Sequence, residues 1–200
     1  MRVREATPAD ASRLAAFAAR LFTRTYAAGG EGPVARSRPA DVAAHVAAHF
    51  SPAHQAAELA DPALVTAVAE GADGAWAGYA QLRLWPSAGA PTPAACAGPR
   101  PRELARLYVD GAWHGRGVAD LLVDAVEARA AAAGGADPLW LAVYQENARA
   151  VAFYRRRGFA VVGDARFTMG DETQRDWLMA RRPSAPAPPA PTPPAPPRRA

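Results

Sequence analysis

One sequence feature limits the possible folds of this chain more than any other. It is a strand pattern, followed by a turn with two glycines and then by a helix pattern. The apolar stretch ELARLYV at 103–109 predicts a buried strand, and a helix pattern begins at Val118. Gly115 and Gly117 lie between them, one residue apart. A second apolar strand, LWLAV at 139–143, follows the helix pattern. A single helical crossover between two strands predicts parallel neighbours and an α/β (α+β) architecture.

The glycine turn itself predicts an anion-binding site. Glycines let backbone N–H groups approach a ligand closely, and the N-terminus of a helix attracts negative charge. Arg116, between the glycines, adds a full positive charge. The turn lacks the Gly-Lys-Ser/Thr ending of a P-loop, and Asp120 replaces the third glycine of a dinucleotide loop. A tight turn without a ligand is the alternative that this short motif leaves open.

The rest of the chain alternates strand and helix patterns, which predicts one domain over 1–182 followed by a disordered Pro/Ala-rich tail at 183–200. The last helix pattern begins at Asn147, a good N-cap, and ends at Gly158. The further strands are expected at 3–7, 63–70, 75–85, 160–163 and 176–181, and the further helices at 8–26, 39–50 and 51–60.

Composition argues against several function classes. The 23 basic residues are all arginines, the net charge is only +4, and no long basic run is present, so no nucleic-acid partner is expected. No apolar run is long enough to cross a bilayer, and charges occupy the N-terminus, so we expect a cytoplasmic protein with no membrane partner. Cys96 is the only cysteine, which predicts no internal disulfide.

No metal is expected either. His45 and His49 lie four residues apart on a predicted helix, with His54 shortly after, which is a spacing that metal pairs use. No glutamate lies between the first two as in a metalloprotease, and no cysteine is in place as a further ligand. Solvated helix histidines are therefore the favoured interpretation.

Two segments together resemble the signature regions of the GCN5-related N-acetyltransferase (GNAT) superfamily, whose members use acetyl-CoA. The family turn reads Gln/Arg-x-x-Gly-x-Gly/Ala, and residues 114–119 meet it except at the first position, where His114 stands. The second segment is NARAVAFYRRRGF at 147–159. A looser resemblance over most of 1–182 is to the bacterial spermine/spermidine N-acetyltransferase branch typified by PaiA.

The resemblance implies a GNAT fold: a mixed central sheet of six to seven strands, flanked by about four helices, with splayed parallel strands at the coenzyme site. It implies a bulge in the strand before the turn and pantetheine paired with that strand. A homodimer is implied by family membership only. The coenzyme-binding residues that the resemblance implies are Leu107, Tyr108, Val109, His114, Gly115, Arg116, Gly117, Val118, Ala119, Asn147 and Phe153.

The resemblance also implies two catalytic residues. An amine with a pKa near ~10.4 must lose a proton before it attacks a thioester, and Glu103 stands where many family members carry an acid that acts as base. Tyr154 matches the family's tyrosine that protonates the leaving thiolate. Adjacent helix positions point in different directions, so we expect Phe153 in the core and Tyr154 in the cleft.

The implied reaction is direct attack of a primary amine, either a small amine or a polyamine, on the thioester. Peptide or protein N-termini, antibiotics, and a non-catalytic acyl-CoA sensor remain as alternatives. A polyamine would favour a channel lined by carboxylates, and the candidates are Glu31, Asp110, Asp171, Glu172 and Asp176.

Overall fold

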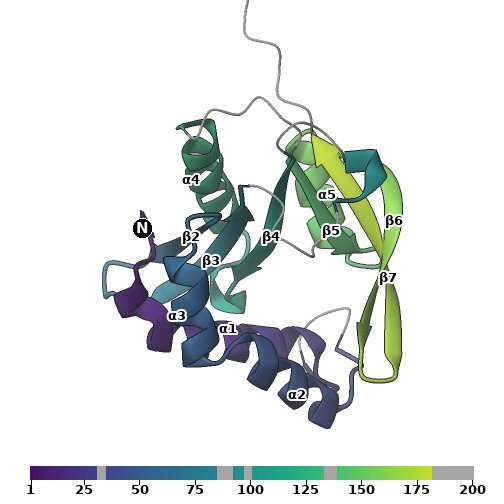
Figure 1. The fold of residues 1–200 in the computed structure, drawn as a ribbon, viewed down its shortest axis with the longest axis horizontal. Coiled ribbons are helices and arrows are strands. Elements are labelled where there is room, and N and C mark those ends of the chain that lie inside the picture. The colour runs from purple at the N-terminus through teal and green to yellow at the C-terminus, as the bar shows by residue number, and fades with distance from the viewer. Residues whose placement is uncertain (31–34, 85–91, 97–100, 133–138, 182–200) are drawn as a thin grey trace, which may run out of the picture.

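The computed structural model describes residues 1–30, 35–84, 92–96, 101–132 and 139–181 (Figure 1). The predicted tail at 183–200 and the candidate Glu31 lie outside these ranges. The main elements in chain order are β1 (Arg2–Glu5), α1 (Ala11–Tyr26), α2 (Pro39–His49), α3 (Pro52–Ala60), β2 (Leu64–Glu70), β3 (Trp76–Arg83), β4 (Arg102–Val109), α4 (Val118–Ala132), β5 (Leu139–Tyr144), α5 (Ala148–Arg156), β6 (Ala160–Met169) and β7 (Glu172–Arg181).

Seven strands form one mixed sheet in the order β1-β2-β3-β4-β5-β7-β6. Only β4 and β5 are parallel neighbours, as predicted, and all other neighbouring strands run antiparallel. The described residues form five α-helices, at the five places where helix patterns were predicted, and the family resemblance implied about four. Helices α1, α2 and α3 lie together below the sheet in Figure 1, whereas α4 lies apart from them.

Two separate apolar clusters hold the layers together. The first joins α4 and α5 to the sheet and includes Leu122, Val126, Leu141 and Met179. The second joins α1 and α2 to the strands and includes Leu14, Phe22, Val42, Val68 and Tyr79. The two clusters contain different side chains of the same strands. A single strand therefore contributes some side chains to the first cluster and others to the second.

Local signals fix the ends of several helices, as predicted for Asn147 and Gly158. The Ser51 hydroxyl accepts the backbone N–H of His54 at 3.2 Å, next to Pro52 at the first position of α3. The Asn147 side chain accepts the backbone N–H of Ala150 at 3.1 Å and caps α5. Gly158, after α5, has a φ of 82°, which a residue with a side chain rarely adopts.

The predicted extents of the last two strands were wrong. Residues 160–163 and 176–181 are only parts of β6 and β7, two strands of ten residues each that form a hairpin turning at Gly170, with a φ of 59°. The missing part of β7, residues 172–175, is polar and carries no strand pattern. The missing part of β6, residues 164–169, does alternate polar and apolar side chains on an edge strand, and the prediction ended this strand too early.

Cys96 is buried and packs against the sheet. It ends a short 3₁₀ turn at Ala94–Cys96 and is 1% exposed, packed with Trp140 and Leu178. Burial raises the pKa of its thiol, as expected of a packing residue rather than of a nucleophile.

Within the described ranges, no helix has both the length and the apolar character that crossing a membrane requires. The domain boundary at 182 stays a prediction.

Candidate functional site

The parallel strands β4 and β5 pair only at one end and then separate. Their register holds at Arg102↔Leu139 and Glu103↔Trp140, and nowhere further along either strand. Beyond this point β4 continues beside β3, and β5 continues beside β7. The edges of β4 and β5 that face each other beyond these pairs are called the splayed edges below, and Figure 1 shows the two strands diverging. Splayed edges leave backbone N–H and C=O groups that can bind an extended ligand.

A bulge accompanies this separation, as the resemblance implied. The β3–β4 register shifts between Gln81 and Leu82, whose partners are Arg106 and Leu104. Ala105 is therefore the extra residue on β4. After the bulge, Leu107 and Val109 pack against the cluster beneath α4 and α5, whereas Tyr108 packs with the α1 side. The three predicted pantetheine contacts are thus divided between both faces of the sheet.

The glycine turn has an open backbone in the left-handed conformation that glycine adopts freely. Gly115 and Gly117 have φ values of 73° and 76°, and a Cβ added to either one would meet no atom within 4 Å. Helix α4 begins at Val118, and the Leu121 N–H donates to the Gly117 carbonyl at 3.1 Å. The N–H groups of the first turn of α4, including that of Ala119, precede this bond and point out of the helix end. The turn fits a phosphate group.

The side chain of His114 fastens this turn to its surroundings. Its Nδ1 lies 2.7 Å from Arg149 Nη1, and its Nε2 lies 3.0 Å from the Val109 carbonyl oxygen. Because Arg149 can only donate, Nδ1 is the acceptor and Nε2 donates to Val109. The sequence did not predict Arg149 here, although this contact places its charge beside the turn. Arg116 is exposed and lies over the Trp113 ring at 5.3 Å.

The expected burial of Phe153 and Tyr154 was wrong. Tyr154 is 8% exposed and belongs to the core cluster, whereas Phe153 is half-buried at its edge. The reason is that Val151 and Tyr154, three positions apart on α5, share its buried face. Burial, with a contribution from nearby Tyr108, raises the pKa of Tyr154. Its hydroxyl therefore keeps its proton at neutral pH. It also lies close enough to Tyr108 of β4 for the two side chains to interact electrostatically.

Glu103 lies at the closed end of the splayed edges. It belongs to the last parallel pair, and its half-buried carboxylate is bonded to Arg83. Burial raises the pKa of Glu103, although the charge of Arg83 acts in the opposite direction. Arg106 binds Glu58 of α3 through two hydrogen bonds of 2.6 and 2.9 Å.

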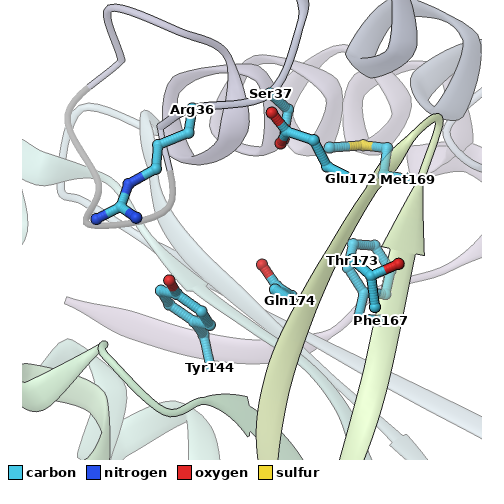
Figure 2. A pocket seen from close by; sticks show the side chains of 8 residues that line it. All are labelled: Arg36, Ser37, Tyr144, Phe167, Met169, Glu172, Thr173 and Gln174. Atoms are coloured by element: carbon cyan, nitrogen blue, oxygen red, sulfur yellow. The ribbon is translucent and has the colours of Figure 1, made fainter.

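A cavity of about 230 Å³ lies beside the β6–β7 hairpin (Figure 2). In Figure 2, Tyr144 and Gln174 stand on one side of it, and Arg36 and Ser37 stand on the other. Arg36 is bonded to Glu146 at 3.3 Å. Among the residues that line the cavity, only Glu172 had been named as a candidate from the sequence. The lining residues are Arg36, Ser37, Tyr144, Phe167, Met169, Glu172, Thr173 and Gln174.

Neighbouring polar side chains connect this cavity with β4. The Tyr26 side chain, at the end of α1, lies close to Tyr108 of β4 and to Gln174 of β7 and interacts with both. Gln174 Nε2 in turn donates to Asp176 Oδ1 at 3.0 Å. Asp176 is 7% exposed, and burial raises the pKa of its carboxyl to about 6. The register places it opposite Tyr144 on β5.

Two other candidate acids are already paired. Asp110 lies 2.7 Å from Arg20 and 3.5 Å from Arg24. Asp171 is exposed and lies 2.6 Å from Arg38. Neither faces the splayed edges in any contact that the structure describes.

The three histidines of the α2–α3 region form ring contacts. His45 stacks on Phe22 with ring centroids 4.6 Å apart, and burial lowers its pKa to about 4. His54 lies 3.3 Å from Glu58. No group of three or more His, Cys, Asp or Glu side chains in the described part of the chain could hold a metal ion.

Comparisons with known proteins cover most of these elements. The family described as Acetyltransferase (GNAT) matches residues 36–159, which include the glycine turn and α5. An uncharacterized N-acetyltransferase of Mycobacterium tuberculosis is 36% identical over 172 residues, which cover 86% of this chain and 97% of that protein.

Solved structures of low sequence identity share the fold. PaiA N-acetyltransferase from Thermoplasma acidophilum, in complex with coenzyme A, has a TM-score of 0.66 at 19% identity, covering 90% of this chain and 98% of that one. Naa20 from Chaetomium thermophilum, in complex with a bisubstrate analogue, has a TM-score of 0.57 at 21% identity, covering 92% and 87%.

Proposed function

Because the chain belongs to the acetyltransferase (GNAT) family, we propose that it transfers the acetyl group of acetyl-CoA to a small primary amine, which attacks the thioester directly. The observation that carries this proposal is the pair of features at the splayed edges. A phosphate-fitting glycine turn follows β4, and a cavity with the acidic side chain of Glu172 in its lining lies beside β7. A group-transfer enzyme needs one site for each of its two substrates.

The coenzyme would be held by the turn and by β4. The N–H groups at Gly115, Gly117 and the start of α4 suit its phosphates, and the charges of Arg116 and Arg149 add to the positive field. The splayed edge of β4 from Leu107 to Val109 offers backbone groups for pantetheine. A backbone N–H of this edge would donate to the thioester oxygen as negative charge develops there. Asn147, whose side-chain oxygen caps α5, and the half-buried Phe153 would contact the coenzyme from the α5 side.

Two side chains would move protons. Glu103, at the closed end of the splayed edges, would take the proton of the amine through a water molecule. Tyr154 keeps its hydroxyl proton at neutral pH and would donate it to the thiolate that leaves. Both proposed roles rest on the positions of the two residues, with Glu103 in β4 and Tyr154 in α5.

The size of the cavity supports a small acceptor. A volume of about 230 Å³ fits an alkyl amine or part of a polyamine better than the N-terminus of a protein. Glu172 in its wall supports the finer proposal of a polyamine, because a second ammonium group would find a carboxylate there.

The test is release of free thiol from acetyl-CoA, with and without butylamine, spermidine, spermine, dipeptides and aminoglycosides. Amine-dependent release with butylamine or spermidine supports the proposal. Release with dipeptides alone would assign peptide N-termini as acceptors. Tight coenzyme binding without release on any amine would favour the acyl-CoA sensor instead.

A further inference from the structure

Asp176 differs from the other acidic side chains that the fold partly removes from water. Among the described residues it is the one buried carboxylate, and neither an arginine nor a histidine lies within ion-pair distance of it. Several half-buried carboxylates each have an arginine partner. These pairs are Asp10 with Arg4, Glu58 with Arg106, Glu70 with Arg4, Glu103 with Arg83, Asp110 with Arg20 and Glu127 with Arg181.

The absence of a partner at Asp176 has an energetic cost. A carboxylate taken out of water without a cation is destabilised unless other groups compensate it. The one hydrogen bond to Asp176 that the structure describes comes from the neutral amide of Gln174. Asp176 is therefore a buried negative charge that an external cation could neutralise, even though the chain contains many arginines.

Its position is suited to the acceptor. Asp176 faces Tyr144 across β5 and β7, four residues along β5 from the last parallel pair at Trp140, or roughly 13 Å. It therefore lies toward the wide end of the splayed edges. Gln174 and Tyr144, its hydrogen-bond partner and its register partner, both line the cavity shown in Figure 2.

Aromatic side chains lie near this carboxylate and in the adjacent cavity wall. Tyr26 and Tyr144 are close enough to Asp176 to interact with it electrostatically, and the Tyr26 ring lies 5.9 Å from that of Phe167 in the cavity wall. Aromatic faces attract cations, and they exclude water that would otherwise screen the carboxylate. A carboxylate beside this cavity is a suitable binding site for an ammonium group.

We propose that Asp176 binds the ammonium group of the acceptor, so that this site selects primary amines that are cationic at neutral pH. This inference rests on the proposed function for its substrate class, but ammonium binding itself can be measured without turnover. Asp176 acts here as a specificity-determining residue that binds the cation before the reaction. The ammonium group must then lose its proton before it can attack, and Glu103 would receive that proton through ordered water, while Tyr154 protonates the leaving thiolate.

The ionisation of Asp176 gives a second, independent readout. The pKa of its carboxyl is about 6, so the charged form declines as the pH falls through that value. Tyr26 and Tyr144 are coupled to it electrostatically, and the pKa of each is raised, so neither carries charge near pH 6. Ammonium binding should therefore weaken below about pH 6 through Asp176 itself.

The test compares the full-length wild-type protein with the variant Asp176→Asn. Calorimetry measures the binding of butyltrimethylammonium, a cation that cannot be acetylated, and of butanol, a neutral molecule of similar length. Steady-state kinetics measures the KM for butylamine. The matched control is Asp164→Asn, an exposed carboxylate on the neighbouring strand β6. The melting temperature at pH 7.5 and the affinity for coenzyme A check that each variant is folded.

We expect wild type and Asp164→Asn to bind the cation and to prefer it to butanol. Asp176→Asn should bind the cation about 10- to 100-fold more weakly, with a similar rise in the KM for butylamine and unchanged affinity for coenzyme A. Its cation binding should also lose the decline below pH 6. Equal cation binding by wild type and Asp176→Asn would overturn the proposal. Cation binding with no turnover on any amine would refute the proposed function but leave Asp176 as an ammonium site.

Discussion

The coenzyme side and the acceptor side of the splayed edges are built in different ways. The coenzyme side is nearly continuous in the chain, because β4, the glycine turn and α4 follow one another from 102 to 132. The acceptor side brings together the end of α1, the segment at Arg36, the end of β5 and the β6–β7 hairpin. The first is specified by neighbouring residues, and the second exists only after the sheet has formed.

The two sides also differ in charge. Arg116 and Arg149 flank the turn that fits phosphate. The acceptor side carries Asp176 without an arginine partner and Glu172 in the cavity wall, and Arg36 in the same wall is paired with Glu146. This contrast matches an anionic cosubstrate and a cationic acceptor, and variants on either side should therefore affect different kinetic constants.

Tyr154→Phe should give the largest effect, because it removes the proton donor common to turnover of every acceptor. We expect kcat to fall by about 10²- to 10⁴-fold, as is typical for loss of a general acid, with KM values little changed. The ring stays in the core, so the melting temperature should hold. Retention of full turnover would make Tyr154 a packing residue only.

Glu103→Gln should lower kcat by about 10²-fold and flatten its acid limb. The pKa of Glu103 is raised by burial, so in wild type the basic form, and with it kcat, declines as the pH falls toward the raised value. A pH profile of kcat measures this directly. An acid limb identical to that of wild type would remove Glu103 from the proton transfer.

Gly117→Ala should weaken coenzyme binding by about tenfold or more, while stability falls by only about 1 kcal/mol from the strained φ. The added methyl group would meet no protein atom, so a larger loss in binding must come from the ligand. Gly74→Ala is the matched control. Gly74 has a φ of 75° with the same open surroundings, but it lies in the β2–β3 turn.

Equal coenzyme affinity in Gly117→Ala and Gly74→Ala would show that the turn at 115–117 does not hold the phosphates.

Asn147→Ala should give the smallest effect. It removes the N-cap bond to the Ala150 N–H and should cost about 1 kcal/mol of stability. Thermal unfolding measures this loss, and coenzyme titration shows whether the side chain also contacts the ligand. An unchanged melting temperature would contradict the capping role.

Sequence patterns predicted what adjacent residues determine. The glycine turn, the cap at Asn147 and the parallel pair of strands were confirmed, because each depends on a local conformational preference or on a single crossover. The bulge at Ala105 followed from family resemblance rather than from any local pattern.

Contacts between distant segments were not predictable in the same way. Tyr26, Arg36 and Gln174 carry no motif, and only the packing of α1 against the hairpin side brings Tyr26 to Gln174. Arg149 at His114 was missed for the same reason. The burial of Tyr154 was assigned wrongly because a helix wheel gives relative directions but does not say which of them meets the sheet.

The most direct test of this account is one kinetic experiment on Gly117→Ala and Asp176→Asn, in which acetyl-CoA and butylamine are each varied at saturating concentration of the other. The account predicts that Gly117→Ala raises the KM for acetyl-CoA and leaves that for butylamine unchanged, and that Asp176→Asn does the reverse. If both variants raised the same KM, or if Asp176→Asn left the KM for butylamine unchanged, the assignment of two oppositely charged substrate sites would be contradicted.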